Sequence, residues 1–163
     1  MSVPEIVREL TVIDYLRKQV AGTLGPTDRT HMRYPTAISQ LLGFRIVEID
    51  SGRAVVELDA DAAIHGNQQG TVHGGLLVEL ADAAIGTAQS TLMEPEESFT
   101  SIDLKATFLR PVWNERLTAT AYATHAGRTV SHYSCEITRG DGKPVATVTS
   151  AVMTLRGADA RGR

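Results

Sequence analysis

Hydrophobic residues recur at three- and four-residue steps in two long segments, which is the spacing of amphipathic helices. The first segment runs from Pro4 to Ala21, with Ser2 suited to a helix start and Gly22 to its end. The second runs from about His73 to Met93, and its wide apolar face is rich in alanine. Because small side chains allow another element to approach closely, we expect a sheet to cover this second helix.

A period of two replaces the helical period in most of the remaining chain, which indicates β-strands. The expected strands occupy residues 44–49, 54–58, 102–108, 117–123, 130–138 and 145–155, and a short helical turn precedes them at 36–42. Strands and helices do not alternate along the chain, which disfavours a parallel doubly wound sheet. The pattern predicts an α+β fold in which one antiparallel sheet of about six strands wraps around the long helix.

This order of elements divides the chain into three parts. We expect an N-terminal helical extension at residues 1–43, one folded domain at 44–155 and a flexible tail at 156–163. The length of 163 residues and the mass of 17.5 kDa fit one domain with short appendages.

Composition and charge disfavour several classes of protein. With 42% hydrophobic and 21% charged residues, the chain has the composition of a globular domain and not of a disordered one. A net charge of −3 and an aromatic content of 5% argue against a nucleic-acid binder. No apolar run is long enough for a membrane span, and the first residues do not resemble a secretory signal. The single cysteine, Cys135, excludes an intrachain disulfide and fits a reducing, cytoplasmic compartment.

The segment from residue 67 to residue 82 is the strongest candidate for a site. Gly74 and Gly75 open the long helix, although glycine costs about 1 kcal/mol relative to alanine inside a helix. A helix start carries unpaired N–H groups and the positive end of the helix dipole, which suit an anion or a developing oxyanion. The plain alternative is a glycine turn that only lets the chain enter the helix. The sequence has no phosphate-loop, nucleophile-elbow or metal-binding motif. Cys135 lies in an alternating strand, which favours a core residue over a nucleophile.

A carboxylate in the apolar part of the same helix strengthens this candidate. Asp82 lies among alanines, where a charged group must be paired, exposed at a cleft or functional. Glu79 lies three residues earlier on a similar side of the helix, so either carboxylate could act. Gly74 and Asp82 are eight residues apart, which is about 12 Å of helical rise. One carbonyl group cannot touch both, so two catalytic groups would have to come from different protomers of a symmetric dimer.

The residues Asn67, His73-Gly74-Gly75 and Asp82, at this spacing, resemble the hotdog-fold acyl-CoA thioesterases. The most similar group comprises the phenylacetate-degradation and 4-hydroxybenzoyl-CoA (Arthrobacter-type) thioesterases. The phrases at residues 106–111 and 127–129 are similar to strand segments of that family, and the resemblance extends over residues 44–155. One position departs from it, because this chain has Gly86 where some relatives have threonine.

The resemblance implies a role for each matching residue in thioester hydrolysis. The backbone N–H of Gly74 would bind the thioester carbonyl, Asn67 would orient the carbonyl or the water, and His73 would support the loop. Asp82, from the partner chain, would act as nucleophile or as general base on water. The spacing of the family motif selects Asp82 over Glu79. Thr100 would help to position the water.

The remaining implied residues bind the substrate. Gly75 belongs to the same helix start as the oxyanion donor, and the basic residues Arg110, Arg128 and Lys143 are candidates for holding the CoA phosphates. The resemblance further implies a homodimer with shared active sites, paired into a homotetramer, with no metal and no cofactor beyond the CoA of the substrate. The acyl group is not specified.

Two other functions of hotdog proteins compete with hydrolysis. A non-catalytic acyl-CoA sensor would not need Asp82, and the first 43 residues, with five basic and four acidic side chains, do not suggest a DNA-binding extension. An enoyl-CoA hydratase would pair an aspartate with a catalytic histidine in a motif that does not occur around Asp82.

Overall fold

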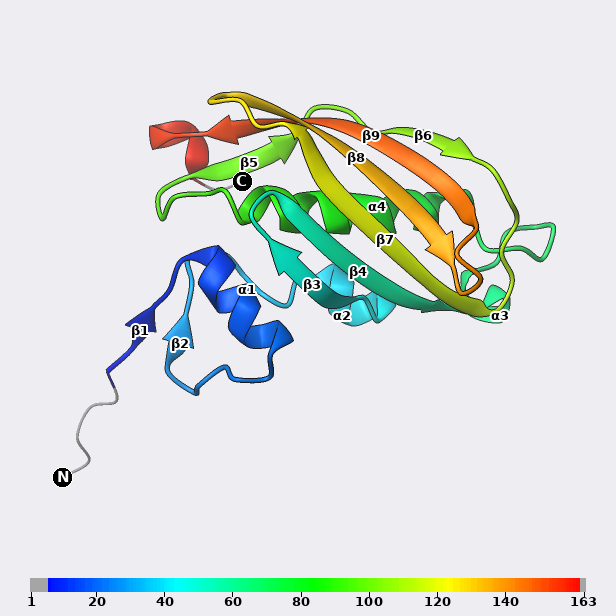
Figure 1. Ribbon diagram of the computed structural model, residues 1–163, viewed down its shortest axis with the longest axis horizontal. Coiled ribbons are helices and arrows are strands. Elements are labelled where there is room, and N and C mark those ends of the chain that lie inside the picture. The colour runs from blue at the N-terminus through cyan, green and yellow to red at the C-terminus, as the bar shows by residue number, and fades with distance from the viewer. Residues whose placement is uncertain (1–5, 162–163) are drawn as a thin grey trace.

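The computed structural model describes residues 6–161, and the predicted hotdog fold is confirmed. A strongly curved antiparallel sheet wraps around one long helix, α4 (Gly74–Ser90), which lies in the hollow of the sheet (Figure 1). The other helices are α1 (Val12–Val20), α2 (Ala37–Leu42), α3 (Ala62–His65) and the 3₁₀ helix η1 (Gly157–Ala160). Within the described residues, no helix has the length and apolar character needed to cross a membrane.

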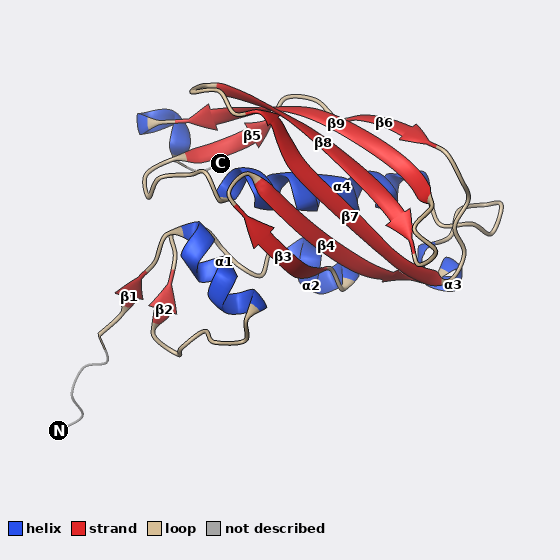
Figure 2. Ribbon diagram, viewed as in Figure 1, coloured by secondary structure: helices blue, strands red, loops and turns tan. Residues whose placement is uncertain are grey.

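The main sheet has seven strands, one more than the sequence suggested. They are β3 (Arg45–Asp50), β4 (Arg53–Ala60), β5 (Ser98–Ser101), β6 (Lys105–Phe108), β7 (Glu115–His125), β8 (Val130–Arg139) and β9 (Pro144–Leu155). Their order is β3-β4-β7-β8-β9-β5, and β6 also pairs with β9. Two short strands outside this sheet, β1 (Arg8–Glu9) and β2 (Asp28–Arg29), pair in parallel beside α1 (Figure 2).

The core lies between α4 and the concave face of the sheet. The helix contributes Leu80, Ala81, Ala84, Ile85 and Ala88, all of which are fully buried. The sheet faces it with one tyrosine and otherwise small or branched residues from four strands: Ala54, Val56, Leu58, Leu117, Ala119, Ala121, Tyr133, Cys135, Ile137, Ala146, Val148 and Val152. The alanines on both surfaces permit the close approach that the sequence predicted.

Buried hydrogen bonds fix the last turns of α4 on the sheet. The Tyr133 hydroxyl donates to the Gln89 side-chain oxygen at 2.7 Å, and the Gln89 amide donates to the Thr154 hydroxyl at 3.2 Å. All three residues are buried, so each polar group replaces its lost water with a protein partner. The network joins α4 to β8 and β9.

The first predicted helix is wrong in its extent. It spans only Val12–Val20, because the Thr11 side chain caps it by accepting a hydrogen bond from the Asp14 N–H. Residues 8–9 before this cap are extended and pair with β2. The expected start at Ser2 and Pro4 lies outside the described residues, whereas Gly22 follows the helix with a positive φ of 68°, as expected.

The strand predicted at residues 102–108 is confirmed only at 105–108, as β6, because a break at 102–104 separates it from the additional strand β5. At the break, a carboxylate oxygen of Asp103 accepts a hydrogen bond from the Ala151 N–H at 2.8 Å. The Asp103 carbonyl accepts one from the Ser150 hydroxyl at 2.7 Å. Both strands therefore stay on the same edge of β9, with a kink between them. A smaller difference occurs in the predicted tail, where residues 157–160 form η1.

Candidate active site

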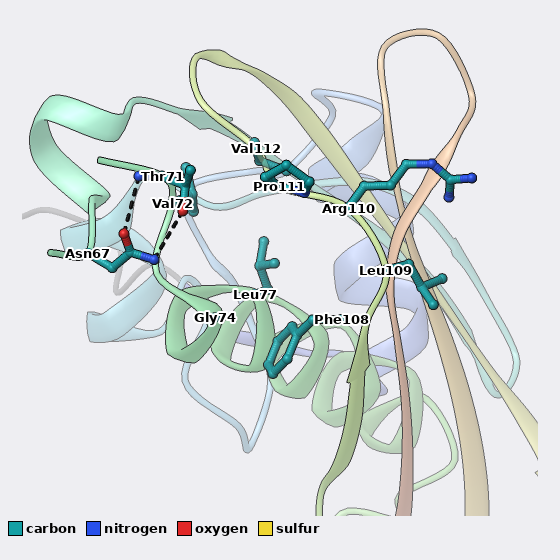
Figure 3. Close-up of a pocket in the computed structure, with 10 residues that line it drawn as sticks. All are labelled: Asn67, Thr71, Val72, Gly74, Leu77, Phe108, Leu109, Arg110, Pro111 and Val112. Atoms are coloured by element: carbon teal, nitrogen blue, oxygen red, sulfur yellow. Dashed lines mark hydrogen bonds between the residues drawn. The ribbon is translucent and has the colours of Figure 1, made fainter. Parts of the chain in front are cut away.

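The loop before α4 is a closed turn built around Asn67. The Asn67 N–H donates to the Thr71 carbonyl at 2.7 Å, and Gly70 completes the turn with a φ of 78° that favours glycine. The Asn67 side-chain oxygen accepts from the N–H groups of Gln69 and Thr71, and its amide donates one hydrogen bond to the Thr71 hydroxyl at 3.0 Å (Figure 3). A side-chain amide carries two donor hydrogens, so one remains for a ligand.

His73 and the two glycines form the start of α4. His73 is the N-cap, and its Nδ1 accepts a hydrogen bond from the Gly75 N–H at 2.9 Å. This contact agrees with a supporting role for His73 and occupies the Gly75 N–H. The Gly74 N–H has no acceptor within the part of the chain that the structure describes. Gly74 is therefore the donor at the helix start that is available to a substrate oxygen.

A cavity of about 460 Å³ opens beside this helix start. Asn67, Gly74 and Leu77 line one side, and residues 108–112 line the other (Figure 3). The Phe108 ring lies so close to Gly74 that an added Cβ would approach it to 3.0 Å. Glycine at this position therefore lets the aromatic ring and the helix backbone meet at the cavity.

Asp82 lies two turns further along α4, half-buried, next to β5. The Ser101 hydroxyl donates a hydrogen bond to Asp82 Oδ1 at 3.1 Å. Burial raises the pKa of the Asp82 carboxyl, and the hydrogen bond from Ser101 opposes this rise. Burial raises the pKa of Glu79 as well, followed in size by the charge of Asp82. A carboxyl group with a raised pKa beside a hydroxyl can take up a proton from water.

Ser101, which the sequence reasoning did not single out, is the hydroxyl residue that reaches the carboxylate. Thr100 precedes it on β5, and successive side chains of a strand point to opposite faces. Since Ser101 faces α4, Thr100 faces away from Asp82. The signal that could have identified Ser101 is the phase of β5, which the break at residue 103 conceals.

The two halves of the candidate site do not meet within one chain. Gly74 and Asp82 lie on a continuous helix, so about 12 Å of rise separates them, as the sequence predicted. The cavity at Gly74 does not include Asp82 among its lining residues.

The predicted phosphate-binding residues also lie apart. Arg110 lines the cavity at Gly74, and its guanidinium donates to the Pro144 carbonyl at the start of β9. Arg128 lies beside Thr129, whose carbonyl accepts from Thr154 near the end of β9. Pro144 and Thr154 are ten positions apart along the extended strand β9, which is about 33 Å. Lys143 lies near Arg110 and forms an ion pair with Asp141. One substrate therefore cannot use both arginines of the same chain.

The described residues contain no group of three or more histidine, cysteine, aspartate or glutamate side chains placed to hold a metal ion. Cys135 is fully buried, and burial raises the pKa of its thiol to about 12. It is a core residue and has neither the exposure nor the lowered pKa of a reactive thiolate.

Comparisons with known proteins agree with this geometry. Residues 69–146 match the family model described as Thioesterase superfamily. A 1,4-dihydroxy-2-naphthoyl-CoA hydrolase of Listeria monocytogenes is 34% identical over 103 residues, covering 62% of this chain and 81% of the relative. The acyl-coenzyme A thioesterase PaaI of Escherichia coli is 37% identical over 112 residues, covering 68% of this chain and 76% of the relative.

Solved structures give the same result. The E. coli PaaI protein from the phenylacetic acid degradation operon superposes with a TM-score of 0.69 at 31% identity, covering 76% of this chain and 87% of that one. The TT0310 protein of Thermus thermophilus superposes with a TM-score of 0.67 at 31% identity, covering 75% and 98%.

Proposed function

The chain belongs to the thioesterase superfamily, and from this premise we propose that it hydrolyses an acyl- or aroyl-CoA thioester to the free acid and CoA. The observation that carries the proposal is the pair of functional groups on α4. One helix presents an N–H at Gly74 that has no acceptor among the described residues and, two turns later, a half-buried carboxyl of raised pKa at Asp82. These are the two groups that thioester hydrolysis needs.

The geometry supports separate roles for the Gly74 N–H and the Asp82 carboxylate. The Gly74 N–H, assisted by the helix dipole, donates to the thioester oxygen and stabilises the negative charge that develops there. The Asp82 carboxylate either removes a proton from the attacking water or attacks the carbonyl carbon itself, with water releasing the acid afterwards. In both routes the carbon–sulfur bond breaks and CoA leaves as the thiol. The reaction uses no cofactor.

A homodimer with shared active sites would bring the two groups together. The edge formed by β5 and β6 leaves four apolar side chains exposed, and a second copy of the chain would cover them: Ile102, Leu104, Phe108 and Leu109. In such a dimer Gly74 of one chain would face Asp82 of the other. A further pairing of dimers into a tetramer belongs to the same proposal. The single buried cysteine supports a reducing, cytoplasmic setting.

The test is a panel of acyl- and aroyl-CoA thioesters incubated with the protein and a thiol reagent. We expect release of CoA thiol with at least one member of the panel. Binding of a thioester without thiol release would instead support the acyl-CoA sensor, and hydration of an enoyl-CoA would support the hydratase.

The pH dependence of hydrolysis should report on Asp82. Since the carboxylate must be ionised, kcat/KM should rise with pH through an ionisation above the ordinary range of aspartate, because burial raises the pKa of Asp82. The Ser101→Ala change removes a hydrogen bond that favours the ionised form, so the acidic limb of the profile should move to higher pH.

The matched control for this shift is Thr100→Ala, on the opposite face of the same strand. It should leave the acidic limb in place. A limb that moves in the threonine variant and not in the serine variant would contradict the assignment of Ser101.

A further inference from the structure

A second cavity, of about 920 Å³, lies at the end of α4 remote from Gly74. Three segments line it: residues 31–36 of the N-terminal extension, residues 95–99 before and within β5, and residues 157–161 around η1. The first and third lie outside residues 69–146 that match the family model. We call this space the distal cavity.

The distal cavity shares a wall with the candidate catalytic carboxylate. Phe99 lines the cavity, and Ser101, two residues further on the same face of β5, donates its hydrogen bond to Asp82. The Phe99 ring lies 3.6 Å from the position that a Cβ on Gly86 would occupy. Gly86 is one helical turn after Asp82, so β5 and α4 continue side by side from the carboxylate to the cavity.

Tyr34 forms a fixed boundary of the distal cavity. Its hydroxyl is 2.6 Å from the Ser90 hydroxyl at the last residue of α4, and burial raises the pKa of Tyr34. Ser90 lies eight residues after Asp82, which is about 12 Å along the helix. This contact holds the N-terminal extension against α4 at a defined distance from the carboxylate.

The lining of the distal cavity suits an apolar chain that reaches it from the carboxylate. Met32, Tyr34 and Phe99 are half-buried. The charged lining residues Arg33, Glu96 and Arg161 are exposed and form a polar rim, and the half-buried Glu97 is held in an ion pair with Arg156. The cavity thus combines an apolar inner wall with a rim that faces water.

We propose that the distal cavity binds the far end of the acyl group, so that the protein prefers medium-chain acyl-CoA thioesters to acetyl- or benzoyl-CoA. This inference rests on the proposed thioesterase function. An extended alkyl chain advances about 1.3 Å per carbon–carbon bond of about 1.5 Å, so a chain of roughly nine bonds spans the rise from Asp82 to Ser90. Each buried methylene should raise kcat/KM by about fourfold until the cavity is full.

The test measures kcat/KM for straight-chain acyl-CoA thioesters from acetyl to palmitoyl, together with benzoyl-CoA. For the unchanged protein we expect a rise to octanoyl or decanoyl and a fall beyond it. Met32→Trp should fill part of the distal cavity, lowering the rate with decanoyl-CoA by about tenfold or more while butyryl-CoA stays within about twofold. Leu41→Trp, on the exposed face of α2, is the matched control and should change neither.

The possible outcomes separate this inference from the proposed function. If no thioester is hydrolysed, both are wrong. If thioesters are hydrolysed with a rate that falls or stays level from acetyl onward in the unchanged protein, only the chain-length inference is wrong. A Met32→Trp variant that folds, as its Tm would show, and keeps the original chain-length profile would overturn it as well.

Discussion

Replacing Asp82 by asparagine should lower kcat for thioester hydrolysis by about 10²- to 10⁴-fold, the range expected for loss of a general base or of a nucleophile. Asparagine has the shape of aspartate, and its side-chain oxygen can still accept the hydrogen bond from Ser101. The change removes a half-buried charge whose ionisation burial already disfavours. The variant should therefore keep the Tm and the oligomeric state of the unchanged protein, and thiol release under saturating substrate measures the loss.

The neighbouring carboxylate provides the control. Glu79 lies one turn before Asp82 on α4, and burial raises its pKa too. The Glu79→Gln variant should retain kcat within about threefold, since only Asp82 carries the hydrogen bond to Ser101. Equal losses in the two variants would show that the carboxylates act as a pair, and a fully active Asp82→Asn variant would rule out the proposed mechanism.

Replacing Gly74 by proline should lower kcat by about 10²- to 10³-fold, because it removes the N–H that we assign to the oxyanion. Proline is tolerated at the first position of a helix, where its missing N–H breaks no helical hydrogen bond. His73, with φ −65° and ψ 133°, already has the extended conformation that a following proline requires. The Gly74→Ala variant brings the same Cβ near Phe108 and keeps the N–H, so it isolates the effect of the donor.

Mixing the two inactive variants tests whether the site is shared. In a dimer of one Asp82→Asn chain and one Gly74→Pro chain, one site holds both defects and the other holds neither. Random exchange of subunits should then restore about a quarter of the full activity. Activity that stays at the level of the separate variants would indicate that each chain works alone.

The long helix and its site could be predicted because their signals are local. The apolar period of α4 and the glycines at its start lie within one continuous segment, and the separation of Gly74 from Asp82 follows from helical rise. The network of Tyr133, Gln89 and Thr154 could not be predicted, because its members come from three elements far apart in sequence.

The choice between Thr100 and Ser101 shows that a tertiary contact can decide which residues of a strand face the helix. Alternation continues through residues 102–108, and in β6 the even-numbered Phe108 lies against α4. Extending that phase backwards would turn Thr100 inward. The kink at Asp103, held by contacts to β9, shifts the phase by one residue, so Ser101 faces the helix instead. The role of Asp103 in the kink can be recognised only when its partner strand, β9, is known.

The extent of the first predicted helix was wrong for a related reason. Apolar residues at helical spacing run from Ile6 onward, but Ile6 and Val7 are 85% and 55% exposed. The pairing of β1 with β2 and the cap at Thr11 decide the conformation there, and the first depends on residues 20 positions away. Spacing alone overestimated the helix because it counts apolar side chains without showing what covers them.

The burial of Cys135 gives the protein an internal reporter of opening. Its thiol sits on the concave face of β8 with no exposure, and its raised pKa keeps it un-ionised near neutral pH. A thiol reagent added to follow CoA release therefore meets no competing protein thiol while the sheet is closed. In the absence of substrate, the slow rate of Cys135 labelling would measure how often β8 separates from α4. The same reagent would therefore report turnover on a short timescale and opening of the sheet on a longer one.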